Sequence, residues 1–332
     1  MTRVSVILPV YNGRRFLREA VSSVVAQTEP PRELIVIDDG STDGSLDELK
    51  DLSAPPFPIR ILQQPNAGQS AARNRAARQA EGEYLAFLDQ DDRWYPQHLE
   101  LLAAALDENP AAGWSYSDFD EIDFDGNLVT RSFLHAHGVR HPKQTIFECI
   151  AADLMVLPSA SMVRRSAFEQ AAGFDEQLSG YEDDDLFVRF FRLGWEHAFV
   201  NRSLTRFRIH TSGSSTSRRF IESRMRFAAK LQQMLPDDPR MLRYYVQDAI
   251  APRFFLCTLD DYVRACSARD WENARIALDV VNHFASLRRS SVRLRWKLSW
   301  IQNPRLFRLL LGLNDRLPYR MRFVRNPTVT LR

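Results

Sequence analysis

The sequence is poor in cysteine and lacks long apolar runs, and each absence excludes a class of protein. Its three cysteines, Cys149, Cys257 and Cys266, are too scattered for a zinc site or a disulfide framework, so we expect reduced thiols in a cytoplasmic protein. Nowhere do about 18 apolar residues follow one another, so no segment suits a membrane-spanning helix. The apolar run at residues 4–10 lacks a small-residue cleavage site and predicts a strand rather than a signal peptide.

An excess of one charge is also missing, because the net charge is only +2 in 332 residues. This balance conceals an acidic body and a basic C-terminal part. Residues 286–332 contain 12 Lys or Arg and one acidic residue, whereas residues 1–285 contain 32 basic and 41 acidic residues. With 45% hydrophobic and 26% charged residues, the composition is that of an ordinary globular protein and excludes a disordered or fibrous one.

The first part of the chain alternates strand patterns with helix patterns. Short apolar runs predict strands at residues 4–9, 33–38, 59–63 and 84–88, and amphipathic stretches predict helices at residues 16–27, 45–52 and 68–80. This alternation predicts a parallel sheet with right-handed crossovers and helices on both faces. In such sheets ligands bind beyond the carboxyl ends of the strands.

The alternation becomes less regular after residue 88. A helix is predicted at residues 97–109, further strands at 114–123 and 158–164, and a helix at 183–193, which indicates a mixed or antiparallel extension of the sheet. From about residue 220 the pattern is almost wholly helical. We therefore predict an α/β domain with a mostly parallel mixed sheet at residues 1–217 and a basic helical region at residues 218–332.

Polar residues follow three of the predicted strands, where each strand ends. The segments are PVYNG at residues 9–13, DDGSTD at 38–43 and DQDD at 89–92. We expect these segments to lie at one edge of the sheet. Neighbouring carboxylates repel one another and raise each other's pKa unless a cation or hydrogen-bond donors balance them. A divalent metal is therefore the expected partner.

The Asp-x-Asp spacing alone is weak support for a metal site, because the chain contains four such triplets. The triplet of Asp89 and Asp91 stands apart because it directly follows an apolar strand, where a solvated acidic surface has no structural reason to begin. For the two triplets within residues 118–125 we favour ordinary loop and capping roles.

Taken together, the motifs resemble those of the family 2 inverting glycosyltransferases, which have a GT-A (Rossmann-like) fold. The motifs are PVYN, DDGSTD, ARN at residues 72–74, FLDQDD, GYEDDDL at residues 180–186 and RFRIH, in this order over residues 4–217. The resemblance implies transfer of a sugar from a nucleotide diphosphate sugar to a saccharide or lipid-linked saccharide acceptor, in cell-surface polysaccharide, lipopolysaccharide or glycolipid synthesis. Residues 218–332 carry no part of it.

The resemblance also implies which residues bind the nucleotide. Pro9 shapes the loop after the first strand, Tyr11 borders the base, and Asn12 belongs to the same site. Asp39 would accept the imide N–H of uracil or thymine, which cytosine lacks, and this favours a UDP- or dTDP-sugar; capping of the following turn is the alternative role. Arg73 would contact the nucleotide or its phosphates, with a surface salt bridge as the alternative.

The implied metal is Mn²⁺ or Mg²⁺, which carboxylate and diphosphate oxygens suit. Asp91 would be its direct ligand, and Asp89 would hold the ribose or assist the metal. His210, in the RFRIH motif, would be a further metal or phosphate ligand, with a structural role as the alternative.

The implied catalytic base is Asp183, which would remove the proton of the acceptor hydroxyl. Glu182, Asp185 and Trp94 are expected to contact the acceptor or orient the loops around it. Three acidic residues in the first turn of a helix also interact favourably with the helix dipole, and this remains the structural alternative.

The basic C-terminal part contains aromatic and basic residues at 292–300 and an apolar run at 306–313. Such segments suit an anionic membrane surface, and a packed helical subdomain with a basic solvated face explains them equally well. We expect no nucleic-acid partner, because basic charge alone is not a recognition motif.

Two other functions compete with glycosyl transfer. A sugar nucleotidyltransferase would need a glycine-rich phosphate loop after the first strand, where PVYNG has one glycine. A catalytically silent nucleotide-sugar-binding scaffold would be expected to have lost Asp91 or Asp183, and both are present.

Overall fold

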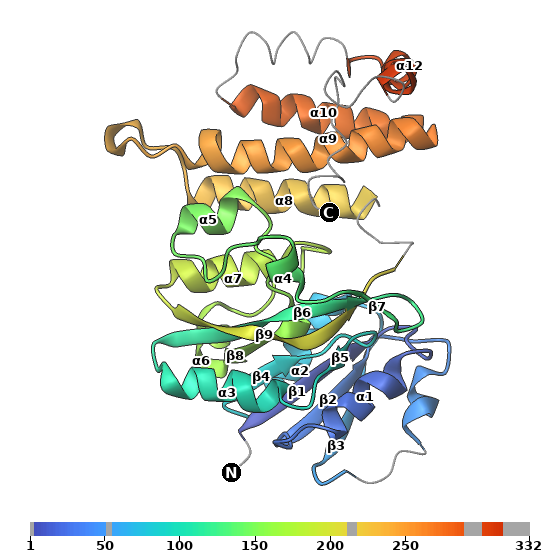
Figure 1. The fold of residues 1–332 in the computed structure, drawn as a ribbon, viewed down its shortest axis with the longest axis vertical. Helices are drawn as coiled ribbons and strands as arrows, with labels where there is room; N and C mark the ends of the chain where they lie inside the picture. The colour runs from blue at the N-terminus through green and yellow to red at the C-terminus, as the bar shows by residue number, and fades with distance from the viewer. Residues whose placement is uncertain (1–2, 51–54, 211–217, 289–300, 315–332) are drawn as a thin grey trace. The chain divides into compact units, whose positions relative to one another are not determined.

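The computed structural model describes residues 3–50, 55–210, 218–288 and 301–314, and the chain divides into two compact units (Figure 1). The first unit comprises Met1–Ile146 and Leu154–Gly213, and the second comprises Phe147–Asp153 and Ser214–Arg332. The predicted aromatic and basic segment at residues 292–300 lies outside the described residues. The predicted domain boundary at residues 217 and 218 stays a prediction.

A mixed sheet forms the centre of the first unit, with the strand order β3-β2-β1-β4-β8-β6-β9-β5 and β7 paired to β6. The strands are β1 Val4–Val10, β2 Glu33–Asp38, β3 Ile59–Gln63, β4 Tyr84–Phe87, β5 Arg93–Trp94, β6 Ala112–Ile122, β7 Leu128–Thr130, β8 Ser161–Arg164 and β9 Glu196–Arg208. The first four strands are mutually parallel, whereas β8 and β5 pair antiparallel with β4 and β9. The predicted mostly parallel sheet with a mixed extension is confirmed.

Helices cover both faces of this sheet (Figure 1). On one face lie α1 Leu17–Val25 and α3 His98–Glu108, which share a core cluster with β1, β2 and β4. The other face carries α2 Gln69–Gln79, α6 Arg165–Gln170 and α7 Glu182–Arg192. Short helices of this unit are η1 Ser45–Leu49, α4 Phe133–Ala136 and η2 Pro158–Ala160, whereas α5 Ile146–Ala151 belongs to the second unit from Phe147 onward.

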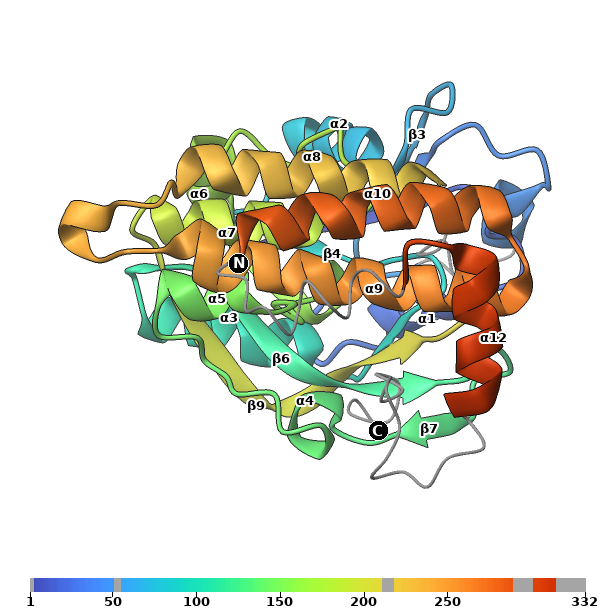
Figure 2. The same cartoon turned by 90° about the horizontal axis from the view of Figure 1, so that it is seen from above.

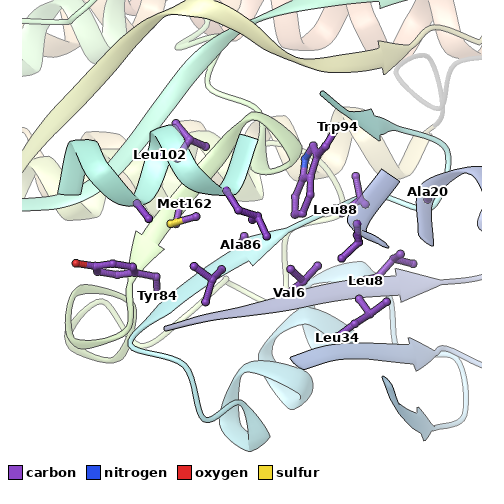
Figure 3. Packing of buried hydrophobic residues seen from close by; sticks show 14 of the residues in the cluster. Val6, Leu8, Ala20, Leu34, Tyr84, Ala86, Leu88, Trp94, Leu102 and Met162 are labelled. Carbon is purple, nitrogen blue, oxygen red and sulfur yellow. The ribbon is translucent and has the colours of Figure 1, made fainter. Parts of the chain in front are cut away.

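The central strands are buried on both faces, as their nearly continuous apolar sequences predict. On β1, Val6 and Leu8 point toward the face of α1 and α3, where they meet Leu34, Ala86 and Leu102 (Figure 3). Ile7 lies between them on the strand and is also fully buried. The two packed faces fix the register of the strands and hence the positions of their carboxyl ends.

Two predicted elements differ from the structure. The helix predicted at residues 45–52 is a short 3₁₀-helix, Ser45–Leu49, and Pro55 and Pro56 further along cannot continue a helical hydrogen-bond ladder. The strand predicted at residues 158–164 begins only at Ser161, because Pro158 lacks a backbone N–H and starts a 3₁₀ turn.

The second unit is helical in its described residues, as predicted. Its helices are α8 Arg218–Met234, α9 Ala251–Ala268, α10 Trp271–Leu287 and α12 Pro304–Asn314, with short turns η4 Pro239–Met241 and η5 Val246–Ile250. α8, α9 and α10 lie side by side (Figures 1 and 2), joined by the rings of Phe227, Phe254 and Phe284. None of the described helices combines the length and apolar character needed to cross a membrane.

Candidate active site

The strands β2, β1 and β4 are adjacent and parallel, so their carboxyl ends lie at one edge of the sheet. The residues that follow these ends include Tyr11, Asp39 and Asp89, as the sequence predicts. A further connection runs along this edge, because Asp39 donates its backbone N–H to the carbonyl of Val10 at 2.8 Å. The sheet therefore gathers the three polar segments.

The loop after β1 is held by the side chain of Gln90. Its amide accepts the backbone N–H of Tyr11 at 2.9 Å and donates to the carbonyl of Tyr11 at 3.1 Å. Gly13 makes room for this amide, since a Cβ there would lie 2.1 Å from Gln90 Oε1. Asn12 links the loop to the next one by accepting the N–H of Thr42 at 2.9 Å. Pro9 is buried within β1.

The Asp39 carboxylate is buried and organises the loop that precedes α2. Its Oδ1 accepts N–H groups from the Gln64 side chain at 2.7 Å and the Ala67 backbone at 2.8 Å, and its Oδ2 accepts the Gly68 N–H at 2.8 Å. Its partners therefore differ from the capping role considered above, since the following turn is capped instead by Asp38, which accepts the N–H of residue 41. Two lone pairs on each oxygen leave one acceptor position, on Oδ2, for a ligand.

Arg73 is the most deeply buried arginine near this edge, with 1% of its surface exposed. Its guanidinium forms an ion pair with Asp89 and lies 3.5 Å from Glu182 Oε1. The Gln69 side chain also donates to Glu182. Arg73 thus makes a buried ion pair and not the surface salt bridge considered as its alternative, and its contact with a nucleotide stays a prediction.

The charges around Arg73 include the predicted catalytic residue. Burial lowers the pKa of the Arg73 guanidinium, but the negative charges of Asp89, Glu182 and Asp183 outweigh it and raise the pKa above its ordinary value. Asp183 is half-buried in the first turn of α7, where its Oδ1 accepts the N–H of Asp184 at 2.8 Å. Burial raises the pKa of Glu182, while Arg73 opposes this shift. Asp89, which follows β4, and the carboxylates at the start of α7 therefore form one cluster around Arg73.

Asp91 contacts the imidazole of His210, with 2.6 Å between Oδ2 and Nε2. Burial and then the charge of Asp89 raise the pKa of Asp91. Asp92 is buried, and its Oδ1 accepts the backbone N–H of Arg208 at 2.9 Å. Burial and the charges of Asp91 and Asp89 raise the pKa of Asp92 well above its ordinary value. Added positive charge would stabilise this group of carboxylates.

Arg208 is a residue that the sequence reasoning did not single out. Its guanidinium donates to the carbonyls of Asp91 at 2.9 Å and Phe124 at 2.9 Å and to the carboxylate of Glu19 at 2.8 Å. It also packs over the ring of Phe16, 4.4 Å from the centroid. Arg208 therefore joins three separate segments around Asp91, and only its place beside His210 in the RFRIH motif hints at this role.

The pairing of β5 with β9 explains why His210 reaches Asp91. Arg93 lies opposite Arg206 in this antiparallel pair, so the residues before Arg93 face those after Arg206. His210 also packs at a steep angle against Phe16 and Phe124, whose ring centroids lie 5.9 and 6.0 Å from its own. The imidazole is thereby held beside the acidic segment.

The remaining predicted residues lie behind the cluster. Asp185 is fully buried and pairs with Arg189 at 2.7 Å, and Arg189 in turn donates to the carbonyls of Ala171 and Gly173. Trp94 has 5% of its surface exposed and donates to the Ser159 carbonyl at 2.7 Å. The indole of Trp94 belongs to the core (Figure 3), and its role in contacting the acceptor or orienting the loops stays a prediction.

The donor set at this edge suits a hard divalent cation. Asp91 supplies a carboxylate of the kind that such cations prefer, and the imidazole of His210 lies beside it. Asp89 is engaged by Arg73. Over the residues that the structure describes, no three His, Cys, Asp or Glu side chains converge as a complete metal site. A cation at Asp91 and His210 would need further ligands from outside these two side chains.

Comparison with known proteins gives a consistent picture. The family model described as Glycosyl transferase family 2 matches residues 5–171. TuaG of Bacillus subtilis (strain 168), a glycosyltransferase provisionally assigned to teichuronic acid biosynthesis, is 37% identical over 134 residues, which cover 40% of this chain and 52% of TuaG. The chain spans from about a fifth to about half of the length of such curated relatives.

Two solved structures share the fold. Staphylococcus aureus TarS 1–349 in complex with UDP-GlcNAc has a TM-score of 0.64 at 18% identity, covering 95% of this chain and 92% of that one. The mannosyltransferase PcManGT of Pyrobaculum calidifontis, in complex with GDP-Man and Mn²⁺, has a TM-score of 0.57 at 18% identity, covering 99% and 84%. The predicted GT-A fold is confirmed.

Replacing Arg208 by lysine should destabilise the protein, because lysine keeps the charge but cannot reach the separate acceptors that the planar guanidinium joins. We expect Arg208→Lys to lower the free energy of unfolding by about 2–4 kcal/mol in guanidinium titrations. Arg206→Lys is the matched control on the same strand, where the guanidinium lies over Tyr95, and should cost less than about 1 kcal/mol. Equal losses in the two variants would contradict the bridging role of Arg208.

Proposed function

The chain belongs to glycosyl transferase family 2, and from this premise we propose that it transfers a sugar, with inversion of configuration, from a uridine or thymidine diphosphate sugar to a hydroxyl acceptor. The observation that carries the proposal is the single charge cluster in which Arg73 joins Asp89, on the donor side, to Glu182 and Asp183 at the start of α7. A transferase needs its leaving-group site and its base at such close quarters.

The donor is proposed from the base-binding edge and from the relatives. Asp39 keeps one acceptor position on Oδ2, which suits the imide N–H of uracil or thymine. TarS binds UDP-GlcNAc and PcManGT binds GDP-Man with Mn²⁺, so the related fold accommodates nucleotide diphosphate sugars with different bases. The neighbouring loop with Tyr11, held by Gln90, would border the base.

A divalent cation, Mn²⁺ or Mg²⁺, is proposed at Asp91 and His210, with Asp89 beside it. When bound, it would offset the negative charge that develops on the departing diphosphate. The protein contributes the positions of these side chains. Arg208 fixes the main chain of Asp91, and Arg73 holds the Asp89 carboxylate.

The proposed base is Asp183. Its carboxylate accepts the proton of the acceptor hydroxyl while the hydroxyl oxygen attacks the anomeric carbon, and the bond from that carbon to the diphosphate oxygen breaks on the opposite side. One displacement of this kind inverts the configuration. Glu182 and Asp185 are positioning residues, because they contact Arg73 and Arg189 and thereby fix the first turn of α7.

The substitution Asp183→Asn separates binding from transfer, because an amide cannot accept the hydroxyl proton as a carboxylate does. We expect the turnover number to fall at least about 100-fold while the Kd for UDP changes less than about threefold. Turnover is measured as UDP released from a panel of UDP- and dTDP-sugars with saccharide acceptors, and the Kd by calorimetry.

Asp125→Asn is the control for this experiment, because Asp125 is also a non-buried aspartate, with 71% of its side chain exposed, and pairs with Arg15. Wild-type turnover is expected there. Turnover of Asp183→Asn close to that of the wild-type protein would remove the catalytic assignment.

The acceptor is proposed to be part of a cell-surface polysaccharide, lipopolysaccharide or glycolipid, as the assignment of TuaG to teichuronic acid biosynthesis supports. We place the protein at the cytoplasmic face of the membrane, docked on anionic lipid. On α12, Leu306 and Leu309 are 52% and 67% exposed, and the same helix carries Arg305 and Arg308. Apolar and basic side chains on one short helix suit such a surface.

Vesicle sedimentation tests this placement. The double variant Leu306→Glu/Leu309→Glu should bind vesicles rich in phosphatidylserine at least about tenfold more weakly than wild type, because two apolar contacts are lost and two negative charges are added. Leu256→Glu is the control, since Leu256 is 61% exposed on α9. Absence of wild-type binding to anionic vesicles at low salt would refute membrane docking.

A further inference from the structure

Gln64 lies directly beside the carboxylate proposed to read the base. Its Nε2 donates to Asp39 Oδ1 at 2.7 Å, and its Oε1 accepts from Arg75 Nη1 at 3.3 Å. Arg75 is itself fixed, because the same Nη1 donates to the Gln63 carbonyl at 2.9 Å. A carboxylate at one end and a guanidinium at the other leave the Gln64 amide one orientation, with its nitrogen toward Asp39.

The hydrogen bonds of these two side chains leave a defined pattern for a ligand. Asp39 accepts from Gln64, Ala67 and Gly68, which uses three of the four lone pairs of the carboxylate and leaves one on Oδ2. The Nε2 group of Gln64 has two hydrogens, and only one of them has an acceptor in the described part of the chain. Asp39 therefore keeps one acceptor position, on Oδ2, and the neighbouring Gln64 side chain keeps one donor hydrogen.

This pattern matches the imide edge of uracil or thymine. There a single ring N–H lies next to a carbonyl oxygen, so Asp39 would accept the N–H and Gln64 would donate to the carbonyl. We infer that Gln64 is a specificity-determining residue that, together with the single free acceptor of Asp39, selects uracil or thymine over guanine and cytosine. The inference rests on the proposed function, which places the base at Asp39.

The two excluded bases fail for different reasons. Guanine also presents a ring N–H beside a carbonyl, but its adjacent amino group is a further donor, and Asp39 has no second lone pair to receive it. Cytosine in the same position would place an acceptor nitrogen against the Asp39 carboxylate and an amino donor against the Gln64 donor, so neither hydrogen bond could form. The 5-methyl group of thymine changes neither the ring N–H nor the carbonyl oxygen, so the pattern accepts both uracil and thymine.

Calorimetric titration of UDP, GDP and CDP in the presence of Mn²⁺ tests the inference. The wild-type protein should bind UDP at least about tenfold more tightly than GDP or CDP. Gln64→Met removes the donor without adding charge and should weaken UDP binding about tenfold, while CDP binding changes less than about twofold. Gln63→Met is the control, since its amide lies 3.5 Å from Asp38 Oδ2 and has no hydrogen bond to Asp39 within the described residues.

The ratio of the affinities for UDP, GDP and CDP shows whether Gln64 contacts the base or only supports the loop. If Gln64 only supported the loop, Gln64→Met would weaken UDP, GDP and CDP equally, and this outcome overturns the inference. A wild-type preference for GDP also overturns it while leaving the proposed glycosyl transfer intact. Failure of the wild-type protein to bind any of the three nucleotides contradicts the proposed function itself, and the inference with it.

Discussion

The repulsion among buried carboxylates at the carboxyl end of β4 is the constraint on which the site depends. Asp91 and Asp92 are desolvated beside Asp89, and all three would repel one another without nearby positive charge. Arg73 provides part of that charge from within the protein, and in doing so it fixes Asp89 relative to Glu182 on α7. The ion pairs of Arg73 thus both balance charge and fix the geometry of the site. The negative charge that Arg73 leaves unbalanced would favour a bound cation.

Much of this arrangement could be predicted from the sequence, because it follows from strand order. Apolar runs buried on both faces identify β1, β2 and β4, and parallel neighbours must bring Tyr11, Asp39 and Asp89 to one edge. Part of the mixed extension was also predictable, from the strand patterns of β6 and β8, whereas the long strand β9 was not predicted. What these patterns lack is any indication that the two-residue strand β5 pairs with β9, and that pairing is what brings His210 to Asp91.

The roles of single polar side chains were harder to predict, since they depend on contacts distant in sequence. Arg73 lies 109 positions from Glu182 in the sequence, and Arg208 lies 189 positions from Glu19. In each pair the guanidinium nevertheless donates a hydrogen bond to the carboxylate. Trp94 follows the acidic segment closely, and its place in the short strand β5, with its indole in the core, could not be predicted from that spacing. The positions of the motifs in the sequence indicate which segments come together. They do not indicate which side chains then form hydrogen bonds.

The central claim is that these carboxylates, balanced only in part by Arg73, bind a nucleotide diphosphate together with a divalent cation. It is tested most directly by calorimetric titration of UDP into metal-free wild-type protein, first without a divalent cation and then with Mn²⁺. The account predicts that Mn²⁺ tightens UDP binding at least about tenfold, because the cation relieves the repulsion between carboxylates and diphosphate. Equal affinity under the two conditions would contradict it.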